Sequence, residues 1–231
     1  MKVVVFGAEG WTGRAVLANL DRHEIRATVY SPESWEQWND IDGAWQGEDV
    51  HCGDIVDFDV VHRATEGMDA IIHLAVHFPN PSTVPVERDQ KAFLVNLKGL
   101  WNCIRSVYPL MKKQQSGKIV NVSSITWLLG RPFRLDYVTS KAGIVGLTHA
   151  VAPELGAHGI NVNCVVPGLV QNESTLKVYQ PEHFKNYSER QVLKRSLTSE
   201  DLCGAVVFFA SDDAEMITGQ SLVVDGGMVF Q

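Results

Sequence analysis

The chain has 231 residues, enough to bury one sizeable core, and no Pro/Gly/Ser-rich linker divides it. A formal net charge of −7 without a basic cluster argues against nucleic acid or an anionic membrane as the main partner. No apolar run approaches the roughly 20 residues that span a bilayer, and the N-terminus does not read as a signal peptide. We therefore expect one cytoplasmic domain over 1–231, with no membrane partner.

Short apolar runs alternate with amphipathic stretches. The runs that predict strands are 2–6, 25–30, 50–52, 70–74, 118–122, 161–165 and 221–224. The stretches that predict helices are 13–20, 58–65, 86–113, 137–155 and 199–210. Pro109 is expected to kink the third of these long helices or loosen its last turn.

Buried Val/Ile strands separated by helices predict an α/β fold. We expect a doubly wound, mostly parallel seven-stranded sheet with helices on both faces, as in a single-domain Rossmann fold. The polar and aromatic segment 171–195 interrupts the alternation. It is predicted to form a helical lid over the substrate site.

The first predicted strand runs into GAEGWTG, a GxxGxxG turn that opens a helix. Glycines are needed where the backbone turns sharply, approaches a pyrophosphate or packs helix on strand, and the helix N-terminus favours phosphates. We predict that a dinucleotide contacts Gly7, Gly10, Trp11, Thr12 and Gly13. Glu9 is expected to point outward, because its charge would oppose the phosphates.

Dinucleotide folds usually read the adenosine ribose at the end of the second strand, with an acid for NAD and a base for NADP. Here that strand ends in Tyr30-Ser31-Pro32, and Glu33 is the nearest acid. Arg14 is the better placed of the two available cations, the other being Arg26, and tips the expectation towards NADP over NAD. A merely solvated Arg14 is the alternative.

Asp54 ends the third predicted strand. It is assigned either to the adenine amino group or to capping the next helix.

Tyr137 and Lys141 are four residues apart in a predicted helix and so share one face. A nearby ammonium can stabilise the ionised phenol, whose free pKa is about 10, and so make the tyrosine an acid-base catalyst. Ser124, in NVSS, and Asn96, in FLVNLKG, could each be a turn or packing residue when taken singly. Their common order and spacing with the pair favour a catalytic set.

That ordered set resembles the short-chain dehydrogenase/reductase superfamily, and the likeness runs from the glycine turn to VDGG at 224–227. The first half departs from the commonest pattern. GxxGxxG and HLAV at 73–76 resemble the extended branch, which contains sugar-nucleotide epimerases and uronate dehydrogenases. From about Asn96 onward, the chain resembles the core form.

The resemblance implies an NAD(P)-dependent oxidoreductase that moves a hydride between the cofactor and an alcohol or carbonyl substrate. Tyr137 would exchange the proton, Ser124 would hold the substrate oxygen, and Lys141 would lower the phenol's pKa and bond the nicotinamide ribose. Asn96 would bind a water that links Lys141 to solvent. Further cofactor contacts are expected at Ser31, Ile55, Leu74, Ala75, Val76, Pro167, Gly168 and Val170, and Asn172 replaces a threonine that bonds the carboxamide.

Two other functions stay open: a non-catalytic NAD(P)-sensing regulator, and an epimerase or dehydratase that recycles its cofactor. The substrate is expected to be an apolar or ring-containing alcohol or ketone, while Arg134 leaves room for an acidic one. Its choice is assigned to the lid, to 77–84, and to Trp127, Leu128, Leu129, Arg131, Phe133 and Arg134. The resemblance also implies a homodimer or homotetramer paired through the helices at 86–113 and 137–155.

Cysteine and histidine spacing gives no sign of a metal site. The histidines show no HxxxH pair, so no metal is expected. The cysteines have no CxxC pair and lie among apolar residues, which predicts reduced and packed thiols at Cys52, Cys103, Cys164 and Cys203.

Overall fold

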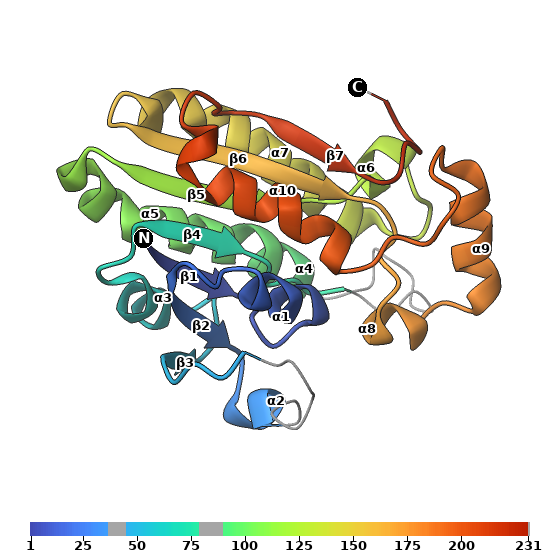
Figure 1. Ribbon diagram of the computed structural model, residues 1–231, viewed down its shortest axis with the longest axis horizontal. Helices are drawn as coiled ribbons and strands as arrows, with labels where there is room; N and C mark the ends of the chain where they lie inside the picture. The colour runs from blue at the N-terminus through green and yellow to red at the C-terminus, as the bar shows by residue number, and fades with distance from the viewer. Residues whose placement is uncertain (37–44, 79–89, 231) are drawn as a thin grey trace.

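The computed structural model describes residues 1–36, 45–78 and 90–230. In that part of the chain, seven strands form one sheet in the order β3-β2-β1-β4-β5-β6-β7, and every neighbouring pair is parallel (Figure 1). The strands are β1 (Lys2–Phe6), β2 (Glu24–Val29), β3 (Val50–Cys52), β4 (Ala70–His73), β5 (Gly117–Val122), β6 (Ile160–Pro167) and β7 (Ser221–Val224). The predicted Rossmann-like α/β fold is confirmed.

Helices connect the strands and cover both faces of the sheet. They are α1 (Trp11–Ala18), α2 (Pro32–Glu36), α3 (Phe58–Thr65), α4 (Lys91–Phe93), α5 (Gly99–Gln114), α6 (Thr126–Leu129), α7 (Leu135–Gly156), α8 (Glu173–Leu176), α9 (Pro181–Arg190) and α10 (Glu200–Ala210). A π-helical turn, η2 (Leu94–Lys98), joins α4 to α5, and a 3₁₀ turn, η3 (Asp212–Ala214), follows α10. Within the described ranges, none of the helices combines the length and apolar character needed to traverse a bilayer.

The long helix predicted over 86–113 is built from three pieces. Residues 86–89 lie outside the described residues, and the helical path runs from Lys91 through η2 into α5. Pro109 lies inside α5, which continues to Gln114 as expected. The short helices α2 and α6 were not predicted, because neither has enough residues to show a helical period.

The side chains of β1 show why the sheet is buried on both faces. Val3 and Val5 belong to a cluster with α1 and α10, whereas Val4 and Phe6 belong to one with α3, α5 and α7. Successive strand residues point to opposite faces. A continuous apolar strand therefore supplies two cores at once, and Figure 1 shows the helices on either side.

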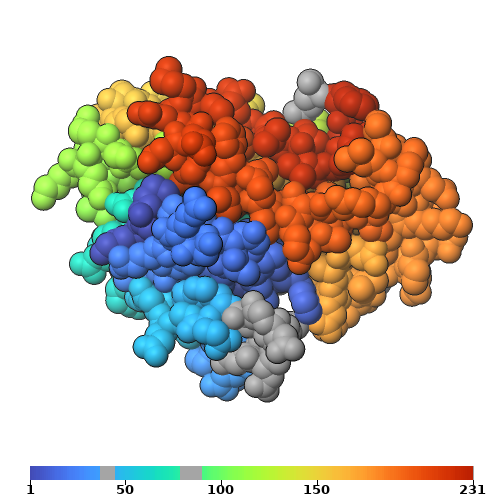
Figure 2. All heavy atoms as spheres, viewed as in Figure 1, coloured from blue at the N-terminus to red at the C-terminus, as the bar shows by residue number. Residues whose placement is uncertain are grey.

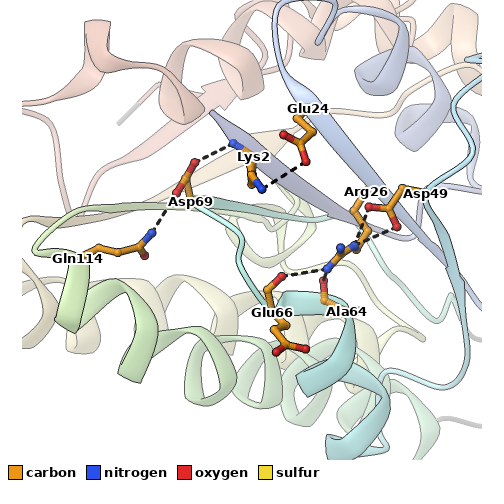
Figure 3. Close-up of polar contacts among 8 residues, drawn as sticks. All are labelled: Lys2, Glu24, Arg26, Asp49, Ala64, Glu66, Asp69 and Gln114. Atoms are coloured by element: carbon orange, nitrogen blue, oxygen red, sulfur yellow. Dashed lines mark hydrogen bonds and ion pairs between the residues drawn. The ribbon is translucent and has the colours of Figure 1, made fainter.

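At the amino end of β2, Arg26 joins three segments of chain. Its Nε donates to the Asp49 carboxylate at 2.9 Å, and its Nη1 donates to the carbonyls of Ala64 and Glu66 at 3.1 and 3.0 Å (Figure 3). In a parallel sheet, ligands bind at the carboxyl ends of the strands. Arg26 therefore stabilises the opposite edge, and the suggestion that it could receive a cofactor phosphate is wrong.

The cysteines agree with expectation at three positions. All four thiols are free, and Cys103, Cys164 and Cys203 are buried. Cys52 is exposed, contrary to the prediction, because it ends the three-residue edge strand β3. In the described residues, no group of three or more His, Cys, Asp or Glu side chains could hold a metal ion.

Candidate active site

The turn after β1 meets the loop after β4, since these two strands are neighbours in the sheet. Gly7 has φ +79°, and a Cβ added to it would lie 2.6 Å from the backbone nitrogen of Ala75. A Cβ on Gly13 would overlap the carbonyl oxygen of Gly7. Packing of the chain itself therefore requires glycine at both positions.

Gly10 differs from the other two glycines of the turn. Its φ of −71° suits any residue, and an added Cβ would meet only the Gly7 oxygen at 3.4 Å. Gly10 lies on the walls of two adjoining cavities. Since no described residue fills this space, the turn has room for a ligand backbone such as a pyrophosphate, next to the N-terminus of α1.

The two cavities lie at the carboxyl ends of the strands. The first has a volume of about 380 Å³ and the second about 460 Å³, and they share Gly7, Gly10, Leu74, Val76, Phe78 and Ser174. Predicted site residues on the first wall are Trp11, Thr12, Gly13, Ser124, Tyr137, Lys141, Pro167, Gly168, Val170 and Asn172. Those on the second are Asp54, Ile55 and Ala75.

Two of the predicted cofactor residues are on neither wall. Arg14 donates from Nε to the Glu9 carbonyl at 3.1 Å, and its guanidinium lies 5.8 Å over the Trp35 ring. Ser31 Oγ accepts from the Ser34 amide at 3.2 Å in the first turn of α2. Both residues lie close to the cavities but contact the protein.

Glu9 does not point outward as expected. The residue is half-buried on the wall of the second cavity, and its Oε1 accepts from the Tyr30 amide at 3.0 Å. Tyr30 is the first residue beyond β2, where the backbone amide needs an acceptor. Burial raises the pKa of Glu9, although backbone hydrogen bonds and Arg14 act to lower it. The sequence offered no signal that this carboxylate would reach the strand end.

The structure brings Ser124, Tyr137 and Lys141 onto the first wall. Ser124 follows β5 and shares the cavity wall with Tyr137 of α7, where hydrogen bonding from Ser124 acts to lower the phenol's pKa. Lys141 is one turn further along α7, with Nζ 5.7 Å from the centroid of the Tyr137 ring. Its Nζ donates to the carbonyl of Val122 at 2.9 Å.

Burial controls the pKa values of this pair. It raises the pKa of Tyr137 to about 12, even though the bond from Ser124 and the charge of Arg134 act in the other direction. It lowers the pKa of Lys141 to about 8. The expectation that Lys141 would already depress the phenol's pKa is not met, because its ammonium is directed to Val122. At neutral pH, Tyr137 holds its proton and can donate it.

Asn96 lies in η2 and is fully buried, on neither cavity wall. Its Oδ1 accepts from the His77 amide at 2.8 Å, and its Nδ2 donates to the His77 carbonyl at 3.3 Å and to Ser140 Oγ at 2.9 Å. The side-chain amide therefore binds protein groups, and its expected role of holding a water stays a prediction. It ties the loop after β4 to α7.

The outer part of the first cavity is lined by Phe78, Arg131, Val178, Tyr179 and Tyr187. The last three come from segment 171–195, which holds α8 and α9 and forms one end of the molecule (Figure 2). Arg131 lies 5.3 Å over the Tyr187 ring. An aromatic wall with one cation could bind a ring-bearing or an anionic substrate.

Other residues expected to choose the substrate lie elsewhere. Arg134 is buried, 4.3 Å over the Phe78 ring, and donates to the Tyr179 hydroxyl at 3.2 Å. Phe133 is 73% exposed, and Trp127, Leu128 and Leu129 pack against the core. Residues 79–84 lie outside the described residues. Asn172 caps α8 by accepting from the Thr175 amide at 3.0 Å.

The chain is similar to known proteins whose names describe reductases and a dehydrogenase. A family model described as enoyl-(acyl carrier protein) reductase matches residues 55–229. The 3-oxoacyl-[acyl-carrier-protein] reductase FabG of Staphylococcus epidermidis is 43% identical over 134 residues, which is 58% of this chain and 54% of that protein. A Rhizobium meliloti protein named "Probable galactose dehydrogenase GalD" is 40% identical over 146 residues, 63% of this chain and 57% of that protein.

The chain thus spans little more than half the length of these two relatives. The crystal structure of 3-oxoacyl-[acyl-carrier protein] reductase from Brucella melitensis superposes with a TM-score of 0.87 at 24% identity. That superposition covers 100% of this chain and 91% of the other. At this identity, the likeness establishes a shared fold.

Proposed function

Because the chain belongs to the short-chain dehydrogenase/reductase superfamily, we propose that it is an oxidoreductase that uses NAD(P)(H) and acts on a small alcohol or carbonyl compound. One observation carries the proposal: Ser124, Tyr137 and Lys141 share a cavity wall with the glycine turn. The names of its relatives, a 3-oxoacyl reductase and a galactose dehydrogenase, both describe chemistry of this kind.

The open space over Gly10 and the two adjoining cavities fit a dinucleotide. Gly7, Gly10, Thr12 and the first amides of α1 would hold its phosphates. Asp54 and Ile55 would flank the adenine, and the loops after β4 and β6 would contact the nicotinamide end. Bound there, a nicotinamide cofactor supplies or accepts a hydride.

The residues of the chain handle the proton. In reduction, the Tyr137 hydroxyl gives its proton to the substrate oxygen, and in oxidation the phenolate takes it back. Ser124 donates to the same oxygen and holds it against the phenol. Lys141 lies one helical turn away, and its ammonium would stabilise the phenolate that remains after proton transfer once it turns from the Val122 carbonyl towards the phenol. Its lowered pKa lets it respond to pH near neutrality.

The choice between NAD and NADP was expected to rest on Arg14. Because Arg14 lies off both cavity walls, we propose here only that the cofactor is NAD or NADP. The expected preference for NADP stays a prediction. Segment 171–195 is proposed to act as a substrate lid within a single domain. A cytoplasmic location also remains part of the proposal.

A homodimer or homotetramer through α5 and α7 completes the proposal. Leu100 and Val107 on α5 and Val145 on α7 are apolar but buried within the protein. Trp101 on α5 is 50% exposed and Leu135 at the start of α7 is 55% exposed, so both are left to such an interface.

The test is a panel of alcohols and ketones assayed with both cofactors, using the wild type, Tyr137→Phe and Tyr108→Phe. Tyr108 lies on α5, away from both cavities, and serves as the matched control. We expect Tyr137→Phe to lose at least about a hundredfold in turnover, the usual contribution of an acid-base group, and Tyr108→Phe to keep it. Unchanged turnover by Tyr137→Phe on every active substrate would contradict the proposal.

Retained nucleotide separates the alternatives. An epimerase or dehydratase that recycles its cofactor would purify with bound nucleotide and need none added. A sensor would bind nucleotide and turn over nothing.

A further inference from the structure

The second cavity contains a carboxylate that the proposed chemistry does not use. Glu9 Oε1 accepts from the Tyr30 amide, while Oε2 is buried without a hydrogen-bond partner among the described residues. A buried carboxylate oxygen left unpaired costs free energy, so such an atom usually has a missing donor. The same wall includes Tyr30, His51 and Asp54.

The position of this carboxylate matters because of what lies at the end of β2. Dinucleotide folds place there the acid that accepts from the adenosine ribose. In this chain the strand itself supplies none, since it runs into Tyr30-Ser31-Pro32. Glu9 comes from the turn after β1, but its hydrogen bond to Tyr30 brings a carboxylate to the same strand end.

The neighbouring acid offers a direct contrast. Glu33 is exposed in the first turn of α2 and lies on neither cavity wall. Hydrogen bonds to its own backbone and to Ser31 lower its pKa. Of the two acids close to this strand end, only Glu9 faces the cavity.

We propose that Glu9 replaces the missing strand-end acid and makes the protein select NAD over NADP. Glu9 lines the cavity, where its carboxylate would accept from the 2′-hydroxyl of NAD. The 2′-phosphate of NADP has little to donate and would bring like charge against a partly desolvated carboxylate. This inference rests on the proposed function, because it presumes that a dinucleotide binds.

The other charges nearby do not reverse this preference. Arg14 packs on Trp35 outside the cavity wall, and Arg26 is anchored at the far end of β2. His51 lies on the wall, but its Nε2 is 3.2 Å from the Asp49 carboxylate. Asp54 adds negative charge to the same wall, and Lys91 reaches it from α4, which follows β4 on the other side of β1.

The test is calorimetric titration of NAD⁺ and NADP⁺ into the wild type, Glu9→Gln and the control Glu33→Gln. We expect the wild type to bind NAD⁺ at least about tenfold more tightly. Glu9→Gln should lower that ratio at least about tenfold, by weakening NAD⁺ and admitting NADP⁺. Glu33→Gln should leave the ratio of the two affinities unchanged. That result would show that loss of a nearby negative charge alone does not change the cofactor preference.

Three outcomes would overturn the inference. In the first, the wild type binds NADP⁺ as tightly as NAD⁺. In the second, Glu9→Gln leaves the ratio of the two affinities unchanged. Either result would contradict the inference and leave the proposed function standing. If neither nucleotide binds, the inference and the proposed function fail together. Thermal melting checks that each variant is folded, and Glu9→Ser repeats the titration if Glu9→Gln unfolds.

Discussion

Asn96 holds the backbone of His77 from both sides, accepting from its amide at 2.8 Å and donating to its carbonyl at 3.3 Å. The same side chain donates to Ser140 Oγ, which in turn donates to the carbonyl of Tyr137 at 2.8 Å. One buried amide therefore couples the loop after β4, which lines both cavities, to the helix that carries Tyr137 and Lys141. Asn96 lies on neither cavity wall, so we expect it to position this loop and helix rather than to contact a substrate.

Replacing Asn96 should separate activity from stability. Asn96→Ala removes the two bonds to the His77 backbone and the bond to Ser140, so we expect a loss of about 1–3 kcal/mol in the free energy of unfolding together with a lower kcat. Asn102→Ala is the control, because this buried α5 amide bonds the carbonyls of Ile55 and Val56 away from Ser140. Urea unfolding and steady-state kinetics measure both effects. A loss of kcat no greater than that of Asn102→Ala would remove the positioning role.

Lys141 should make the protein more stable as the pH rises above neutrality. Below pH 8 it is charged in the folded and unfolded states, so folding bears the full cost of burying the charge. Between about 8 and the ordinary 10.5, the folded protein loses this proton before the unfolded chain does, and stability increases. Lowering the pKa across that interval corresponds to about 3 kcal/mol.

Lys141→Met should therefore be more stable than the wild type at pH 7, by up to that amount. The difference should shrink as the pH approaches 10.5. Urea unfolding of both proteins at pH 7, 9 and 10 measures it. A gap that stays constant with pH would show that burial of this charge is not its source.

Gly10 and Gly13 should respond differently to the same substitution. Gly13→Ala places a Cβ into the Gly7 carbonyl, so we expect its melting temperature to fall by several degrees. Gly10→Ala meets only ordinary contact and should melt like the wild type while binding nucleotide at least about tenfold more weakly. Thermal melts and titrations distinguish them. Full nucleotide affinity in Gly10→Ala would place the phosphates elsewhere.

Arg131 should determine how the protein treats negatively charged substrates. It faces the first cavity, whereas Arg134 is held within the aromatic cluster. For any substrate with a carboxylate, Arg131→Gln should raise KM several-fold or more, and the neutral amide of that substrate should be unaffected. Arg105→Gln, exposed on α5 over the Phe58 ring, is the control. Equal effects on charged and neutral substrates would argue for a packing role instead.

Trp101 tests the expected assembly. It is half-exposed on α5, and Trp101→Glu should shift the molecular mass measured by light scattering towards the monomer. Phe208→Glu is the control, on α10 and also partly exposed. An unchanged mass for Trp101→Glu would place any interface on another face.

The fold could be predicted from the pattern of apolar residues along the sequence. Continuous apolar runs such as KVVVF and INVNCVVP indicate strands that are buried on both faces. The candidate catalytic positions Ser124, Tyr137 and Lys141 were predicted from spacing within one helix and one strand end, and the structure places them on one cavity wall. The hydrogen-bond partners of individual side chains could not be predicted from sequence spacing. Glu9 binds an amide twenty-one residues away, and Asn96 binds one nineteen residues before it. The pKa of Tyr137 depends on burial by elements distant in sequence, which no local pattern records.

The two ends of β2 are under separate constraints. Arg26 anchors one end to two other segments, one at Asp49 and the other at the end of α3. Tyr30 and Ser31 at the other end belong to no such anchor. Mutations that alter cofactor preference can therefore accumulate at one end of the strand without weakening the fold at the other. Under the proposed function, such a division would make cofactor choice an evolvable trait and a practical target for redesign.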